Sequence, residues 1–280
     1  MAAEGTPARD GHATPGGWAG GRLSRSALPG LALFVVLAVC GLAALAGGVI
    51  GRDPVLVVGG AVLLPLFGSL IGLLLVASSR GSGAATTLVP WPGGGTRAVR
   101  FGYRAAAYGW FGAVTAACAL FALGMAVGAA TVWGGVLGWV SAAVLAGGAA
   151  LLGWHLVVML RLAPGGLLLS PAGIAHAGLT SFYSVPWAAV HAVAATSLRT
   201  SVLVVKAEPA PASVLRRHTG RFDTGELQFL PFLVVRTYWL AADREVVRQA
   251  VAFYLAHPEL RDELATPAAV RRIVEGRTRA

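Results

Sequence analysis

Charged side chains are scarce in this sequence. Asp, Glu, Lys and Arg make up 12% of its 280 residues, whereas about 25% is usual in a soluble domain. Between Arg104 and Arg161 none of the four occurs. Because about 20 apolar residues suffice to cross a bilayer, residues 105–161 have room for two crossings. This composition excludes an ordinary soluble domain and predicts an integral membrane protein with a transmembrane hairpin in this segment.

Cysteine and lysine are also rare. Cys40 and Cys118 each lie near the middle of an apolar run, where a small packing side chain is expected rather than a disulfide, unless the two helices touch. Lys206 is the only lysine, so the net charge of +10 comes almost entirely from arginine. In a membrane protein, such an excess of cations is typical of the segments that flank the spans on the cytoplasmic side. The positive charge therefore needs no nucleic-acid partner, and we expect none.

Sequence motifs of known chemistry are missing. The chain has no Walker A loop, dinucleotide fingerprint, Gly-x-Ser-x-Gly elbow or zinc-protease helix. Its histidines are not spaced with Cys, Asp or Glu as metal ligands would be; the four considered are His176, His191, His218 and His257. We therefore expect no enzymatic activity, no catalytic or metal-binding residues and no cofactor.

Two further uncharged runs predict a first hairpin over residues 27–77, with spans at 28–50 and 55–77 joined by a short polar turn. Residues 1–26 are rich in Gly and Pro and predict a disordered tail. Arg22 and Arg25 before the first span also fit a signal peptide. However, its apolar run of 23 residues exceeds the roughly 7 to 15 of a signal peptide, which favours a retained helix.

The second hairpin has predicted arms at residues 106–131 and 136–160, with a turn around Trp133. Residues 78–104, with many Ser, Pro and Gly followed by arginines, predict a flexible basic linker. Arg52 is the only cation at one set of span ends, whereas the other set has seven: Arg22, Arg25, Arg80, Arg97, Arg100, Arg104 and Arg161. This bias predicts a cell (plasma) membrane protein with the linker and both termini in the cytoplasm.

From residue 162 onward the pattern changes to short β-rich segments, which marks a domain over residues 162–265. Strands are expected at 167–169, 174–177, 182–185, 190–194, 202–205 and 232–240, with a seventh possible at 227–230. Residues 207–225 predict a long polar loop. Asp243 is a candidate N-cap for a helix that ends at His257-Pro258, and Thr266-Pro267 starts a short helix in the segment 266–280, which Gly276 ends.

Residues 167–174 (LLLSPAGI), 185–190 (VPWAAV), the closing helix and the run 254–264 (YLAHPELRDEL) resemble bacterial pleckstrin-homology-like (PH-like) domains that follow a transmembrane hairpin. The resemblance covers roughly residues 160–265 and the preceding hairpin. It implies a strongly bent, seven-stranded antiparallel sheet capped by one helix, on the inner face of the membrane. The expected fold is therefore four transmembrane helices plus a C-terminal α+β domain. No catalytic residues come with the resemblance.

Two candidate sites stand out. The first strand-to-strand loop, residues 170–173, has no cation, which argues against specific binding of inositol phosphates. Arg216, Arg217 and Arg221, beside His218, could contact anionic lipid headgroups or form a solvated loop. His155 near the end of the last span is a functional suspect, although interfacial packing is the favoured interpretation.

We therefore predict a multi-pass membrane protein whose PH-like domain is a protein-interaction or membrane-surface module. The rival hypotheses are a transporter or channel component and a sensor of the state of the membrane. Against transport, the four spans contain no Asp, Glu, Lys or Arg. The expected partners are the lipid bilayer and a cytoplasmic or membrane protein, and a homo-oligomer stays open.

Overall fold

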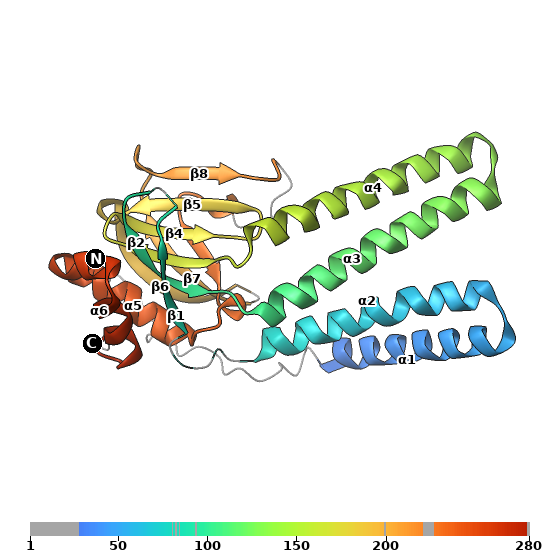
Figure 1. The fold of residues 1–280 in the computed structure, drawn as a ribbon, viewed down its shortest axis with the longest axis horizontal. Coiled ribbons are helices and arrows are strands. Elements are labelled where there is room, and N and C mark those ends of the chain that lie inside the picture. The colour runs from blue at the N-terminus through green and yellow to red at the C-terminus, as the bar shows by residue number, and fades with distance from the viewer. Residues whose placement is uncertain are drawn as a thin grey trace, which may run out of the picture.

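Four long helices extend from one side of a domain that is built from two β-sheets (Figure 1). The structure is a computed structural model. It describes residues 28–79, 81, 83, 85–92, 94–198, 200–220 and 227–278. The predicted disordered tail lies outside the described residues, as do Arg22, Arg25, Arg80 and Arg221.

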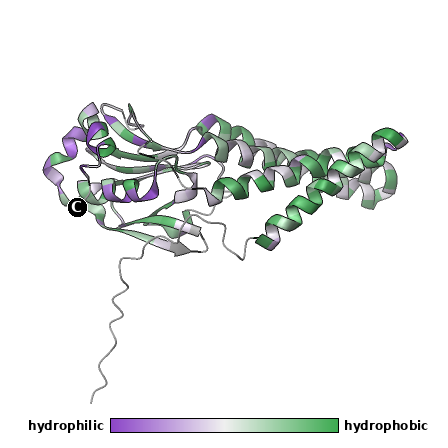
Figure 2. Ribbon diagram, turned by 90° about the horizontal axis from the view of Figure 1, so that it is seen from below, coloured by the Kyte–Doolittle hydropathy of each residue, from purple (hydrophilic) through white to green (hydrophobic). Residues whose placement is uncertain are grey.

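The four helices are α1 (Leu28–Gly51), α2 (Pro54–Ser78), α3 (Ala105–Gly128) and α4 (Gly135–Leu162), and a π-helical turn, Ala129–Trp133, extends α3. All four are long and apolar enough to cross a membrane, which is compatible with a multi-pass membrane protein (Figure 2). Their bounds agree closely with the predicted spans, because an unbroken apolar run is the sequence signal that defines such a helix.

The first hairpin is packed closely through glycine. Asp53 caps α2 by accepting a hydrogen bond from the Val55 N–H at 2.9 Å. A Cβ added at Gly48 would lie 2.6 Å from the Val57 nitrogen, and one added at Gly41 would lie 2.9 Å from the Leu64 nitrogen. These glycines therefore let the backbones of α1 and α2 approach each other.

The sheets are antiparallel. The larger has six strands in the order β1-β2-β3-β4-β5-β8, namely Thr86–Pro90, Arg97–Gly102, Gly166–Ser170, Gly173–Ala177, Ser181–Pro186 and Val214–Arg217. The smaller has three strands in the order β6-β7-β9, namely Val190–Leu198, Thr200–Ala207 and Leu233–Arg236. Neighbouring strands of the larger sheet follow one another along the chain except at two places: α3 and α4 lie between β2 and β3, and β6 and β7 lie between β5 and β8.

The prediction of a flexible linker over residues 78–104 is wrong, because this segment contains β1 and β2. Strand β2 pairs with β3, with Val99 opposite Leu169 and Phe101 opposite Leu167. Val99 and Phe101 are fully buried, so this strand contributes to the core of the domain. The domain therefore begins before the second hairpin, and α3 and α4 are inserted between two neighbouring strands of one sheet.

Two other expectations need correction. The possible strand at 227–230 is a 3-10 turn, Leu227–Phe229, and the strand expected at 232–240 ends at Arg236, where a 3-10 turn, Thr237–Trp239, begins. The predicted loop 207–225 contains β8, whose four residues are all exposed. Strand β8 forms through backbone pairing with β5, and its sequence has no apolar alternation that would mark it.

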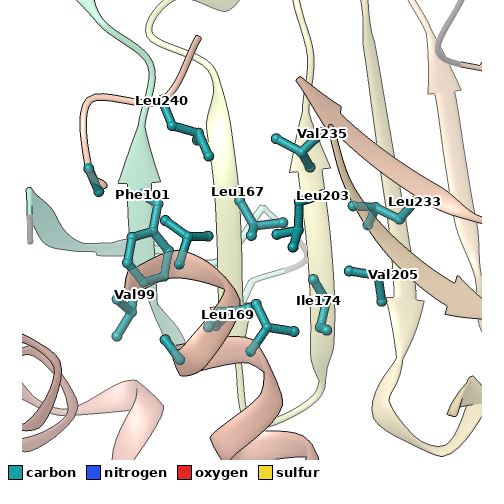
Figure 3. Packing of buried hydrophobic residues seen from close by; sticks show 14 of the residues in the cluster. Val99, Phe101, Leu167, Leu169, Ile174, Leu203, Val205, Leu233, Val235 and Leu240 are labelled. Atoms are coloured by element: carbon teal, nitrogen blue, oxygen red, sulfur yellow. The ribbon is translucent and has the colours of Figure 1, made fainter. Parts of the chain in front are cut away.

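The core lies between the two sheets (Figure 3). Phe101 and Leu167 from the larger sheet and Leu203 and Val235 from the smaller one are fully buried in it. Burial of such side chains contributes roughly 1.5 to 3 kcal/mol each relative to exposure. One continuous core therefore joins residues on both sides of the inserted hairpin.

The C-terminal helices lie at the end of the domain opposite the long helices (Figure 1). They are α5 (Arg244–Ala256), a 3-10 segment (Pro258–Ala265) and α6 (Pro267–Val274). Asp243 caps α5 through the Glu245 N–H, and Thr266 caps α6 through the Ala268 N–H, so both predicted caps are confirmed. The sheets differ from the single seven-stranded sheet that the PH-like resemblance implies.

Candidate functional site

Arg104 joins three parts of the molecule where the long helices meet the sheets. Its Nε donates to the Leu240 carbonyl at 2.7 Å, in the segment after β9. Its other nitrogens donate to Ser79 Oγ at 2.6 Å, to the Ser79 carbonyl at 3.2 Å and to the Val76 carbonyl at 3.4 Å. One side chain on the N-terminal side of α3 thus binds the end of α2 and the sheet domain.

The electrostatics of this contact favour α2. The last carbonyls of a helix have no partner within the helix and carry partial negative charge. Helix α2 has no basic residue in its own last turn, so Arg104 supplies the missing cation from a distant part of the chain. Burial lowers the pKa of the Arg104 guanidinium from its ordinary value, which still leaves it charged at neutral pH.

An aromatic cluster fills the space behind Arg104. Trp239, which is 3% exposed, lies at its centre, with ring centroids 5.7 Å from Tyr103, 5.9 Å from Tyr108, 5.6 Å from Phe111 and 5.7 Å from Tyr238. Edge-to-face and tilted arrangements of this kind are favourable beyond simple burial. The cluster packs α3 directly onto the segment after β9.

Hydrogen bonds of two tyrosines, one just before α3 and one in its first turns, tie the start of the second hairpin to the larger sheet. The Tyr103 hydroxyl is hydrogen-bonded to His176 Nε2, on β4. The Tyr108 hydroxyl accepts from the Gly165 N–H at 3.2 Å, in the connection from α4 to β3. His176 is 5% exposed and is thus a satisfied core histidine. The second hairpin is consequently fixed to the sheet at both of its ends.

The two hairpins touch at the same level. A Cβ added at Gly72 of α2 would overlap the indole ring of Trp110 on α3. In contrast, a Cβ at Gly68, one turn earlier, would meet nothing within 4 Å. The bare backbone at Gly72 therefore receives Trp110, and this contact packs the first hairpin against the second.

Two cavities lie beside α3 and α4 near this junction. The first, the Thr219 cavity, has a volume of about 290 Å³ and is lined by Phe111, Thr115, Leu151, Leu152, Trp154, His155 and Thr219. The second, the Tyr108 groove, has a volume of about 520 Å³ and is lined by Tyr103, Ala105, Tyr108, Gly109, Gly112, Ala113, Ala116, Leu156, Leu160, Ala163 and Pro164. Helical spacing puts their α3 residues on opposite sides of the seam with α4.

The predicted cationic cluster is close in sequence to Thr219, which lines the Thr219 cavity. Arg216 and Arg217 on β8 are exposed, and Thr219, two residues further on, lines the cavity with Trp154 and His155. The His218 N–H donates to the Thr180 carbonyl at 3.0 Å, which holds this stretch beside β5. The structure therefore brings the candidate arginines and His155 to the same end of α4, a proximity that sequence spacing does not reveal.

The other predicted residues are spread over the junction. Arg97 is exposed on β2, and Arg161 is exposed in the last turn of α4. Arg100 donates to the Pro164 carbonyl at 3.5 Å, and its buried Nε has no hydrogen-bond partner within the described part of the chain. In the loop 170–173, Ser170 Oγ donates to the Gly173 carbonyl at 3.1 Å. The Ser170 carbonyl accepts from Trp187 Nε1 at 2.7 Å, and the indole of Trp187 is part of the core.

The remaining histidines considered as metal ligands lie in separate surroundings. His191 is exposed on β6, and His257 stacks on Phe253 with ring centroids 4.4 Å apart. Within the residues that the structure describes, no group of three or more His, Cys, Asp or Glu side chains could hold a metal ion.

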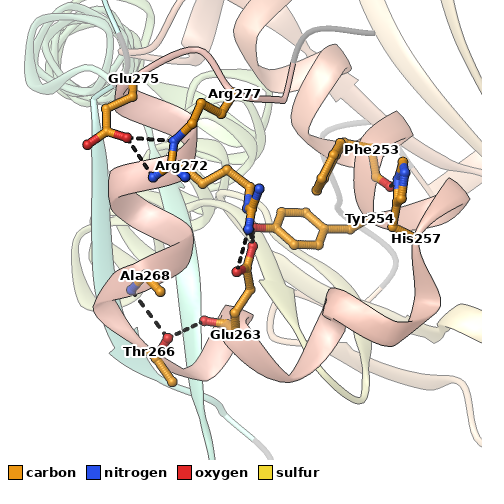
Figure 4. A network of polar contacts seen from close by, with 9 residues as sticks. All are labelled: Phe253, Tyr254, His257, Glu263, Thr266, Ala268, Arg272, Glu275 and Arg277. Atoms are coloured by element: carbon orange, nitrogen blue, oxygen red, sulfur yellow. Dashed lines mark hydrogen bonds and ion pairs between the residues drawn. The ribbon is translucent and has the colours of Figure 1, made fainter.

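A polar network at the far end of the domain closes the C-terminal segment (Figure 4). The Tyr254 hydroxyl donates to Glu263 Oε1 at 2.7 Å, and Arg272 Nε donates to the same oxygen at 2.6 Å. Burial and the adjacent Glu263 carboxylate raise the pKa of Tyr254 well above its ordinary value. This network fastens α6 and the 3-10 segment to α5, and every member has a structural partner.

Sequence reasoning assigned Arg104 only to membrane orientation and missed its contacts with α2 and Leu240. One signal was present: a cation just before the first turn of a helix is unfavourable towards the helix dipole. Such a residue suggests a partner elsewhere in the fold.

No protein-family model, curated protein or solved structure gives a significant match to this chain. Its function is therefore argued from the geometry of the junction.

Proposed function

We propose that this chain is a multi-pass membrane protein whose sheet domain lies on the cytoplasmic surface and binds anionic phospholipid headgroups through Arg216 and Arg217. One observation carries the proposal: Thr219, just after these arginines, shares a cavity with Trp154 and His155 of α4. Because Thr219 follows Arg217 by two residues, the cations of β8 lie near the end of an apolar helix and so near the bilayer surface.

The depth of this contact follows from helix length. The hydrocarbon core is about 30 Å thick, or about 20 helical residues. Counted along α4 from the turn at Gly134, 20 residues reach Trp154, and counted from Trp139 they reach Met159. Trp is favoured at this boundary, so Trp154 and Thr219 lie at the level of the headgroups.

The cytoplasmic orientation is supported by the flanking cations. Among the described residues, Arg97, Arg100, Arg104 and Arg161 lie on the side of the sheet domain, whereas Arg52 lies in the turn at the opposite end of the first hairpin. The side richer in such cations is the cytoplasmic one. Because that leaflet carries anionic lipid, the exposed guanidinium groups of β8 face a surface of opposite charge.

The likeness to bacterial PH-like domains belongs to the same proposal. It is supported by antiparallel sheets around one core and by α5, which packs on β6. A lipid-facing role through β8 needs no cationic first loop, in agreement with the absence of cations in residues 170–173. We include no catalysed reaction in the proposal.

The test is hydrogen–deuterium exchange of the full-length protein in nanodiscs of phosphatidylcholine, with and without 30% phosphatidylglycerol. We expect slower exchange in residues 214–220 when the anionic lipid is present. R216Q/R217Q should abolish that difference, because each cation contributes about 1 kcal/mol near an anionic surface. R271Q/R277Q, which changes two exposed arginines at the far end of the domain, is the matched control and should retain it. Equal exchange in the two lipids would contradict headgroup binding.

A protein-interaction role is the second candidate, and one observation favours it. Strand β8 is an edge strand with exposed apolar side chains, Val214 at 42% and Leu215 at 36%. An exposed edge offers unpaired backbone groups to an added strand. Slow exchange of β8 in detergent only after addition of cell extract, with no effect of anionic lipid, would favour this alternative.

A further inference from the structure

The Tyr108 groove is an apolar channel beside the second hairpin, separate from β8. Its wall on α3 is made of small side chains, namely Ala105, Gly109, Gly112, Ala113 and Ala116, and its wall on α4 is made of Leu156 and Leu160. A Cβ added at Gly109 would meet nothing within 4 Å, so the space beside this glycine is empty of protein atoms. The volume of about 520 Å³ is in the range of small-molecule pockets.

The groove has an apolar end and a polar end. From Ala105 to Ala116 it runs about 16 Å along α3. Tyr103, Tyr108 and Pro164 close it on the side of the sheet domain. A Cβ added at Gly112 would lie 3.3 Å from Met159 and 3.5 Å from Leu156. With the boundary near Trp154 to Met159, the part of the groove from Gly112 to Ala116 therefore enters the acyl-chain region, and the part towards Ala105 lies in the headgroup layer.

A cation stands at the polar end. The Arg100 guanidinium reaches the groove residue Pro164 with a long hydrogen bond of 3.5 Å to its carbonyl, and its buried Nε has no hydrogen-bond partner among the residues that the structure describes. Arg161 follows the groove residue Leu160 directly in α4. None of the lining residues is acidic. The polar end therefore has the positive charge that a phosphate requires.

We infer that the Tyr108 groove binds one anionic phospholipid of the inner leaflet, with the start of an acyl chain along Gly112, Ala113 and Ala116 and its phosphate beside the Arg100 guanidinium. Arg161 adds a second positive charge near the phosphate. This inference rests on the membrane insertion and orientation proposed above. An acyl chain fits because it fills a narrow apolar channel that no side chain of the described chain fills, and the positive charge of Arg100 beside Pro164 complements a phosphate at the polar end.

The test measures lipid retained by the purified full-length protein in a neutral detergent, by native mass spectrometry after addition of equal amounts of phosphatidylglycerol and phosphatidylcholine. We expect one phosphatidylglycerol per chain. R100Q should reduce the preference for phosphatidylglycerol about tenfold, the equivalent of about 1.4 kcal/mol. R161Q should reduce it less. A matched control is R97Q, which changes an exposed cation of the same strand that does not contact the groove lining.

A second set of variants tests the apolar part. A113L/A116L fills the channel and should reduce retention of both lipids, whereas A143L, at an exposed position of α4 outside both cavities, should not. If the double variant does not fold, A113L alone carries the same expectation. Retention that is equal in wild type, R100Q and the filled variant would overturn the inference.

Failure of this inference is distinguishable from failure of headgroup binding by β8. R216Q/R217Q should leave the retained lipid unchanged, since these arginines are not part of the groove lining. Conversely, A113L/A116L should leave the lipid-dependent exchange of residues 214–220 unchanged. Loss of both signals in both sets of variants would contradict two separate sites.

Discussion

The two helical hairpins are attached to the sheets in different ways. The second is inserted between β2 and β3, which are neighbouring strands, and the aromatic cluster around Trp239 joins it to the core. The first hairpin is joined to the sheet only through the chain that follows α2. Side-chain contacts also hold it: Arg104 binds the end of α2, and Trp110 packs on Gly72. This difference indicates that the second hairpin and the sheets form one folding unit, to which the first hairpin is docked.

The largest expected effect is on the shared core. Trp239→Ala removes the ring that contacts Tyr103, Tyr108 and Phe111, and should destabilise the sheets and the second hairpin together by about 3 to 5 kcal/mol. Thermal unfolding in detergent should show one lowered transition. Trp139→Ala, at a site that is 65% exposed on α4, is the control and should have little effect. Separate transitions of the sheets and the hairpin would contradict a single unit.

Arg104→Ala should act mainly on the first hairpin. It leaves the carbonyls of Val76 and Ser79 without their charged donor, at a cost of about 2 to 3 kcal/mol. Limited proteolysis around residues 80–85 should become faster while the sheet domain remains folded. Arg97→Ala, on the exposed surface of β2, should leave the cleavage rate within a factor of about two, since exposed substitutions change stability by about 0.5 kcal/mol or less. Equal rates in the two variants would exclude a docking role for Arg104.

Gly72→Leu separates the two hairpins by steric overlap with Trp110. We expect a destabilisation of about 1 to 3 kcal/mol and a larger distance between spin labels on α2 and α3, because a tightly packed contact cannot accept added atoms. Gly68→Leu provides the comparison on the same helix, where the added side chain meets open space. An unchanged distance in the Gly72 variant would mean that Trp110 does not dock the first hairpin.

The smallest effect concerns a region that touches neither hairpin. Burial alone would raise the pKa of Glu263, but hydrogen bonds from Arg272 and Tyr254 outweigh it and hold the pKa below the ordinary value of 4.5. A lowered pKa stabilises the fold above the ordinary value, and this contribution is lost as the pH falls through the lowered value.

Glu263→Gln should therefore lower the melting temperature at pH 7, by an amount equivalent to about 1 to 2 kcal/mol, and this difference should shrink below pH 4. Differential scanning fluorimetry across this range measures it. Glu275→Gln, in the exposed pair with Arg277, should be nearly neutral at both pH values. A difference that grows on acidification would contradict the assigned direction of the pKa shift.

The sequence predicted the helical part of the fold better than the sheets. Uncharged runs define α1 to α4 because no other structure of that length satisfies their composition. Strand β2 was missed because Val99 and Phe101 alternate over only a few residues, next to a stretch rich in Gly and Pro. Strand β8 was missed because its pairing with β5 comes from tertiary structure, and its residues carry no alternating pattern.

The candidate site was only partly visible in the sequence. The charges of Arg216 and Arg217 were evident, but their position beside Trp154 and His155 depends on β8. The contacts of Arg104 and the Tyr108 groove depend on helices that meet only in the folded chain.

Amide hydrogen exchange of residues 97–102 in the full-length protein tests the central claim most directly. If β2 is a strand between β1 and β3, its amides should exchange as slowly as those of residues 166–170, since both strands belong to one core. Fast exchange of residues 97–102 beside protected residues 166–170 would instead indicate a flexible linker. It would contradict the insertion of the second hairpin between neighbouring strands.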